Sequence, residues 1–257
     1  MKFISTLLLI ILVSAANSQA WRISTNYSLG VPQQQMEKNI QPAHSLQGGI
    51  LYQFKHSKQL SAGIELGIGS YASKRIEQTF QFDNNTAAVV PVNYNSNTFN
   101  VNLQGRLNLL KDNYFVIPYV NAKAGLYNFF STIYIDDPAD AGGCHALEQK
   151  TIMNDKTLYW SAGGGLQIDP AIFSKNKRRG NVLIDISANT IHGGTMDYIN
   201  TKNLIDAQSV TDPAGKPLQV KFINASTQAI HEHTVAQVFT SSLRLLEFRA
   251  GVVVKLD

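Results

Sequence analysis

The chain contains very little cysteine. Cys144 is its only cysteine, and a single thiol cannot form a disulfide within the chain. A secreted scaffold that depends on several disulfides is therefore excluded. We interpret Cys144, which follows Gly142 and Gly143, as a loop residue rather than a catalytic thiol.

Long apolar runs are also missing, apart from one at the N-terminus. Leu7–Val13 is continuously apolar and follows Lys2, but the apolar stretch around it is shorter than the roughly 20 residues that a transmembrane helix needs. Ser18-Gln19-Ala20 then places small residues at the two positions that signal peptidase reads. We predict a signal peptide over residues 1–20, without a lipoprotein cysteine after it, and a single domain over residues 21–257.

The positive charge is not clustered. The formal net charge is +4, yet the basic residues are scattered and 175–179 is the one basic run. Nucleic acid is therefore not an expected partner. A mean hydropathy of −0.10 is typical of a soluble protein. It does not exclude a membrane β-barrel, because each strand needs only about 9–11 residues with one apolar face.

Alternation of apolar and polar residues is what the sequence has in abundance. Between Phe99 and Leu110, one face is almost entirely leucine, valine and phenylalanine, and the other is asparagine, glutamine and arginine. Such a period of two indicates a strand with one apolar side. The same pattern predicts eight strands, at residues 21–30, 46–54, 60–69, 99–110, 114–129, 158–168, 182–189 and 247–256.

The length of each connector depends on whether the strand before it is odd-numbered or even-numbered. Tight polar turns follow the second and fourth strands, and a medium connector follows the sixth. Long connectors follow the first, third, fifth and seventh strands. Short turns at one rim and long loops at the other are typical of outer-membrane barrels, whereas a soluble sandwich has no reason to sort its loops in this way. We predict an eight-stranded antiparallel up-and-down transmembrane β-barrel.

Charged residues of both signs lie on the polar sides of these strands. In a membrane barrel the apolar side faces lipid, so the polar side faces the lumen, where a buried charge needs a partner. We predict a lumen charge network made of Glu65, Arg106, Lys123, Asp185, Glu247 and Arg249. Arg244 shares the apolar side of the last strand. At ~3.3 Å per residue and a tilt of ~40° it lies about 30 Å from Leu256, beyond an apolar band of roughly 25 Å, so we expect it at the outer rim.

Two segments resemble the small OmpA/OmpX-like outer-membrane β-barrel proteins, in particular those of Bacteroidota: Pro118–Tyr127 (PYVNAKAGLY) and Arg249–Leu256 (RAGVVVKL). The resemblance is architectural and extends over residues 21–257. It implies a bacterial outer-membrane location with periplasmic short turns and extracellular long loops. It also implies contact with outer-membrane lipid and with the barrel-insertion machinery during biogenesis. We expect no cofactor.

An eight-stranded barrel is just wide enough for side chains to fill it, so we expect no large pore. Function is then expected in the long loops, through binding, adhesion or scaffolding in the envelope. Within the longest predicted loop, 193–235, His231 and His233 project to one side of an extended segment and are weak metal-ligand candidates. The acidic residues of the loop that contains Cys144 do not match a calcium-binding pattern.

No enzyme is predicted. Ser187 and Asn189 share a strand face, but His192 has the opposite parity, so the three do not converge as a hydrolase triad must. Two minor alternatives stay open, a small pore and a lipid-A-modifying barrel enzyme. The main alternative is a soluble lipocalin-like barrel that holds a small ligand. It requires Arg106, Lys123, Asp185 and Arg249 to face water and Leu103, Leu107 and Val252 to fill the interior.

Overall fold

The computed structural model describes residues 21–81, 87–136, 146–174, 180–202, 215–223 and 230–256. The predicted signal peptide lies outside these residues and stays a prediction. Among them, no helix is both long and apolar enough to cross a membrane. The elements, in chain order, are β1 (Trp21–Pro32), α2 (Gln35–Asn39), β2 (Ala43–Gln53), β3 (Leu60–Gln81), β4 (Ala87–Asn108), β5 (Val116–Asp136), β6 (Ala146–Ile168), the 3-10 helix η1 (Pro170–Phe173), β7 (Val182–Ile199), β8 (Lys216–Ile223) and β9 (Ile230–Leu256).

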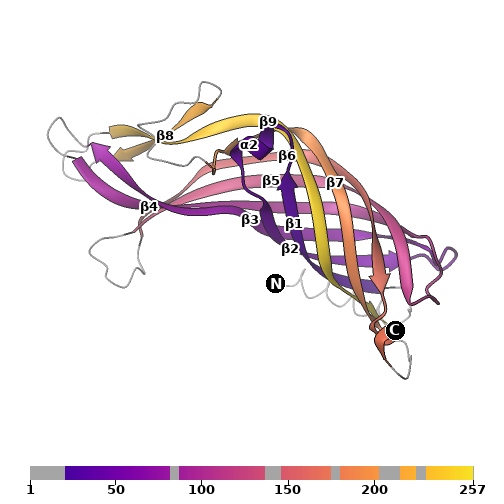
Figure 1. The fold of residues 1–257 in the computed structure, drawn as a ribbon. Coiled ribbons are helices and arrows are strands. Elements are labelled where there is room, and N and C mark those ends of the chain that lie inside the picture. The colour runs from indigo at the N-terminus through magenta and orange to yellow at the C-terminus, as the bar shows by residue number, and fades with distance from the viewer. Residues whose placement is uncertain are drawn as a thin grey trace, which may run out of the picture.

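The strands form one antiparallel sheet that closes on itself (Figure 1). Neighbours along the chain pair from β1 through β7, β7 pairs with β9, and β9 pairs with β1 from Trp21↔Leu256 to Pro32↔Leu245. Closure removes the free edges that an open sheet would carry. The predicted eight-stranded up-and-down barrel is confirmed for this ring. The ninth strand, β8, lies beside the outer part of β9 within a segment that we predicted as loop, and that part of the prediction is wrong.

The two rims of the barrel differ, because the strands extend much further beyond the barrel at one rim than at the other. At one rim β2 and β3, and β4 and β5, are joined by short turns, and the connection between β6 and β7 contains η1. At the other rim β3 and β4 each run for 22 residues and stay paired from Leu60↔Leu107 to Gln81↔Ala87. We predicted loops over much of this length, so the strand bounds are corrected outward. Short turns are periplasmic in barrels of this type, which places the strand extensions outside the cell.

Irregular pairing explains why the sequence hid these extensions. The pairing of β3 with β4 shifts between Ser70 and Ala72, and that of β7 with β9 shifts between His192 and Thr195. A bulge inserts one residue and therefore moves the inward face from one parity to the other. On β3, Tyr71 is buried and the inward side chains that follow it include Ala72 and Ile76. A search for unbroken alternation consequently stops at the bulge.

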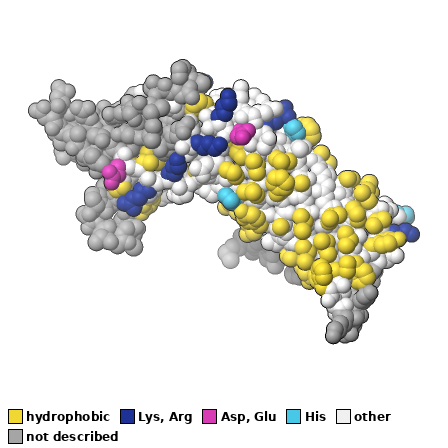
Figure 2. Space-filling model, in the orientation of Figure 1, with side chains coloured by type: hydrophobic (Ala, Val, Ile, Leu, Met, Phe, Trp, Pro, Cys, Tyr) yellow, Lys and Arg dark blue, Asp and Glu magenta, His cyan; other side chains and the backbone are white. Residues whose placement is uncertain are grey.

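In the half of the barrel next to the short turns, the polarity is the reverse of that in a soluble protein. The outward side chains form an apolar surface, in which Leu103 is 67% exposed and Leu158 73% exposed (Figure 2). The charged residues of the predicted network are all buried inside. The soluble lipocalin-like alternative required the opposite arrangement and is wrong. The apolar band is the surface that meets lipid.

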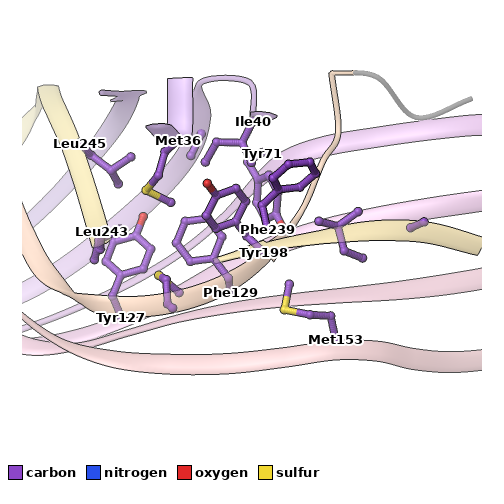
Figure 3. Packing of buried hydrophobic residues seen from close by; sticks show 14 of the residues in the cluster. Met36, Ile40, Tyr71, Tyr127, Phe129, Met153, Tyr198, Phe239, Leu243 and Leu245 are labelled. Carbon is purple, nitrogen blue, oxygen red and sulfur yellow. The ribbon is translucent and has the colours of Figure 1, made fainter. Parts of the chain in front are cut away.

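The extracellular half has an ordinary hydrophobic core. Its aromatic residues, which include Tyr71, Tyr127, Phe129, Tyr198 and Phe239, converge inside the strand extensions (Figure 3). The ring centroids of Tyr127 and Phe129 are 5.3 Å apart and those of Tyr71 and Phe129 are 5.0 Å apart. Such spacings are those of favourable aromatic pairs. We had predicted only a polar interior, so this core is a correction to the sequence interpretation.

Candidate functional site: the closed barrel interior

A cluster of two carboxylates, one ammonium group and one guanidinium group occupies the middle of the barrel. Lys123 on β5 donates to Glu65 on β3 at 2.8 Å and lies 3.4 Å from Glu247 on β9. Arg249 on β9 completes the cluster by donating to Glu65. The side chains of all four are at most 4% exposed. Since these strands are far apart in sequence, only closure of the barrel brings the four groups together.

Neutral side chains satisfy the remaining acceptor sites of this cluster. Three of them donate to Glu247: Gln47 at 2.7 Å, Ser28 at 2.9 Å and Asn189 at 3.2 Å. A buried ion pair is stable only when such hydrogen bonds compensate for the lost hydration. Glu247 therefore joins strands from both sides of the ring, because β1, β2, β5 and β7 all contribute a donor to it.

A second ion pair lies nearer the periplasmic rim. Arg106 donates to Asp185 at 3.1 Å, and its guanidinium carbon lies 4.1 Å from the ring centroid of Tyr119. The hydroxyl of Tyr119 donates to the other oxygen of Asp185 at 2.6 Å. All six residues of the predicted network thus lie inside the barrel, in two clusters. Their three positive and three negative charges balance.

Sequence reasoning missed a third cluster, at the periplasmic rim itself. Arg22 on β1 pairs with Asp112 in the β4–β5 turn at 2.5 Å and donates to Gln53 at 2.9 Å. Gln167 accepts from Arg22 at 3.1 Å and donates to Asp185 at 3.2 Å, so it links this cluster to the second ion pair. The signal available in the sequence was Arg22, which alternates with the outward-facing Trp21 and Ile23. Nothing in the sequence indicated that Asp112 turns inward.

The extracellular mouth is covered by the connection between β1 and β2. The short helix α2 places Met36 at 0% exposure within the aromatic core, and Ile40 beside it is equally buried. Backbone hydrogen bonds hold this connection on two sides, from Gln33 to Arg244 and from Thr201 to Asn39, each at 2.9 Å. The predicted first loop therefore folds into the barrel mouth and closes it.

The other candidate residues are dispersed. Ser187 and Asn189 point inward and are buried, whereas the partners of His192 are the outward-facing Trp160 and Arg244, so the triad geometry is absent for these three. His231 and His233 fall on β9, but their side chains are not among those described, as is also true of Cys144. In the part of the chain that is described, no group of three or more His, Cys, Asp or Glu residues could hold a metal ion.

No protein-family model and no curated protein matches the chain. Solved structures in which the backbone follows a similar course include Neisserial surface protein A, at 10% identity over 93% of this chain and 97% of that one, with a TM-score of 0.47. Ail of Yersinia pestis is 12% identical over 91% and 96%, with a TM-score of 0.34. A major outer membrane protein of Thermus thermophilus is 10% identical over 91% and 98%, with a TM-score of 0.41.

Those scores are low, so the assignment rests on the geometry of this barrel. A closed antiparallel ring with an apolar outer surface, a charged interior and short turns at one rim is the architecture of outer-membrane barrels. The protein is therefore a β-barrel of the bacterial outer membrane.

Proposed function

We propose that the protein is a non-enzymatic outer-membrane barrel that conducts no solutes and acts at the cell surface through its strand extensions. One observation supports the first part of this proposal: buried side chains contact one another across the barrel interior at several successive levels. From the periplasm outward these levels are the Arg22–Asp112 pair, the two buried ion-pair clusters and the aromatic core beneath α2.

Occlusion of this kind is costly to open. A path for solutes through the middle would have to separate Lys123 and Arg249 from Glu65, and a charge left without its partner inside the barrel costs several kcal/mol. At the mouth it would also have to remove Met36 from the aromatic core. The two barriers are independent, because one is electrostatic and the other depends on apolar packing.

Conductance in planar lipid bilayers tests this closure. The purified barrel, inserted at the same density as a general porin, should produce no stepwise current, while the porin should produce discrete channels. Reproducible single-channel steps from the wild-type protein would contradict the proposal.

The strand extensions support the second part. A membrane strand needs about 9–11 residues, yet β3, β4, β5 and β6 each have 21 to 23. Half of each strand thus serves no purpose in spanning the bilayer. The extensions have their own hydrophobic core, which makes them a rigid platform outside the cell. Binding, adhesion or scaffolding in the envelope would use such a platform.

A shortened hairpin tests the binding role. Because Ile76 pairs with Val92, residues 77–91 can be replaced by a two-residue turn without removing either side chain from the core. Cells that display the full-length or the shortened protein would be compared for adhesion to surfaces coated with an acidic polysaccharide, a neutral polysaccharide or fibronectin. We expect weaker adhesion of the shortened form to one of these surfaces at equal surface expression. Equal adhesion to all three would contradict a binding role for this hairpin.

A further inference from the structure

The outward face of the barrel has a sharp upper boundary. On β6 the outward-facing row changes from Leu158 to the exposed Lys156, and on β9 it changes from Phe248 and Leu246 to Arg244. On β7 the outward-facing row changes from Ile186 and Ala188 to Thr190 and then His192. Since the strands are antiparallel neighbours, these changes mark the level at which the hydrocarbon region ends and the polar headgroups begin.

Three side chains form a continuous row across three strands, which reaches this boundary at Arg244 and begins at Trp160, one outward position to the periplasmic side of Leu158. Trp160 pairs with His192 in the β6–β7 register, and His192 pairs with Arg244 in the β7–β9 register. The indole and imidazole rings are stacked, with centroids 4.5 Å apart and planes at 22°. Trp160 is 55% exposed on the outer surface, so the row faces lipid rather than the barrel interior.

The hydrogen bond between His192 and Arg244 determines which groups the row presents. The guanidinium of Arg244 contacts Nδ1 of His192. Arginine is always protonated and has no acceptor, so Nδ1 must accept and the imidazole proton must lie on Nε2. Nε of Arg244 is itself buried and has no hydrogen-bond partner. The row therefore offers N–H donors and a positive charge beside an aromatic surface, and it offers no acceptor.

We propose that the Trp160–His192–Arg244 row binds a phosphate group of an outer-leaflet glycolipid. Donors without acceptors, together with a fixed positive charge, fit a phosphate oxyanion. The position selects a lipid as its source, because phosphates of membrane lipids lie at the level of Arg244 and the acyl chains would lie along Leu246 and Phe248, on the periplasmic side of Arg244 on β9. The carboxylates further out on β6 and β7 do not compete, since Asp155 accepts from the backbone of Asp197 at 2.7 Å and Asp197 accepts from Thr240 at 2.5 Å.

Strand β2, which is separated from β9 by β1 alone, supplies a matched control. His44 on β2 also lies at the boundary beside an aromatic residue, but its Nδ1 contacts the hydroxyl of Tyr27 at 2.5 Å, and no cation joins this pair in the described structure. A His44→Phe variant changes a lipid-facing histidine in the same way as His192→Phe, without affecting the proposed site.

Native mass spectrometry of the detergent-solubilised full-length protein tests the site with bisphosphorylated lipid A as the probe. Arg244→Gln should weaken binding by about tenfold, the loss expected for one charge-assisted hydrogen bond. His192→Phe, which keeps the stack on Trp160, should weaken it less, and His44→Phe should have no effect. Lipid A stripped of phosphate should bind the wild type as weakly as bisphosphorylated lipid A binds Arg244→Gln. Retained heat-modifiable migration on gels would show that each variant is folded.

Equal affinity of Arg244→Gln and the wild type, or of the two lipids, would overturn the proposal. So would effective competition by inorganic phosphate at millimolar concentration, because the site would then recognise the anion and not the lipid. The proposed closure and surface function do not depend on this result, since the row lies on the outer wall.

Discussion

The membrane-spanning half and the extracellular half of this barrel are built from the same strands with opposite polarity. On β4, Arg106 and Gln104 point inward and Leu103 outward near the periplasm, whereas further out Tyr94 points inward and Asn97 outward. On β5 the inward side chain changes from Lys123 to Phe129 over six positions. The difference teaches that the solvent, not the strand, decides which face is apolar. Lipid surrounds one half and water surrounds the other.

The two interiors are consequently stabilised in different ways. The membrane half depends on compensated charges, whose geometry must be satisfied because each would be expensive alone. The extracellular half depends on apolar burial and close packing, as in soluble proteins. Substitutions placed at equivalent positions in the two halves should therefore differ in cost, and three comparisons test this.

The largest effect is expected from Glu65→Gln. This change leaves Lys123 and Arg249 with Glu247 as their one remaining carboxylate within the cluster, and breaking a buried ion pair in this way costs about 3 to 5 kcal/mol. Ser61→Ala, on the same strand and equally buried, removes a hydroxyl that has no hydrogen-bond partner and should cost little. Urea unfolding of both variants in lipid vesicles measures the difference. A loss for Glu65→Gln no greater than that for Ser61→Ala would show that the charge cluster does not stabilise the barrel.

Phe129→Ala should rank second. Phe129 is 0% exposed in the extracellular core, and removing a packed phenylalanine leaves a cavity that costs about 3 to 4 kcal/mol. Phe99 on β4 provides the comparison, because it faces lipid with 42% of its surface exposed. Fluid acyl chains fill the space left by Phe99→Ala, so only the transfer contribution is lost there. The same unfolding assay measures both variants, and equal losses would mean that the extracellular core is not tightly packed.

The smallest of the three effects is expected from a lysine on the outer wall. Leu103→Lys places a charge in the middle of the apolar band and should cost about 2 to 4 kcal/mol. Asn97→Lys lies on the same face of the same strand, above the boundary, and should cost less than about 0.5 kcal/mol. The folded fraction and the unfolding free energy in vesicles report the contrast. If the two lysines are tolerated equally, the boundary lies below Leu103 and the assigned membrane level is wrong.

Much of the membrane half was predictable from sequence for one physical reason. A strand between lipid and a polar interior must alternate with a strict period of two, and that period is visible without any structure. Segments such as Phe99–Leu110 therefore indicated the strand, its facing and the inward position of Arg106. The same reasoning selected six of the buried charged residues, although not Arg22, because a charge on the polar side of such a strand has to point inward.

The extracellular half was harder to predict from the sequence. Bulges near Ser70 and His192 change the phase of the alternation, and the face that carries apolar residues changes there as well. A segment such as 70–81 therefore reads as a polar loop, although it is a paired strand. Met36 and Ile40 likewise lie in a short connection whose sequence does not show that it folds back into the barrel mouth.

The sequence by itself determined the strand count of the ring, the inside-out polarity of its membrane half and the short-turn rim, because each follows from local spacing. Tertiary structure alone decided which charge meets which, as with Glu65 and Arg249, and how the barrel is closed at both ends. Those contacts depend on the stagger of a closed ring, which brings together residues from strands far apart in the chain. No local pattern encodes that stagger.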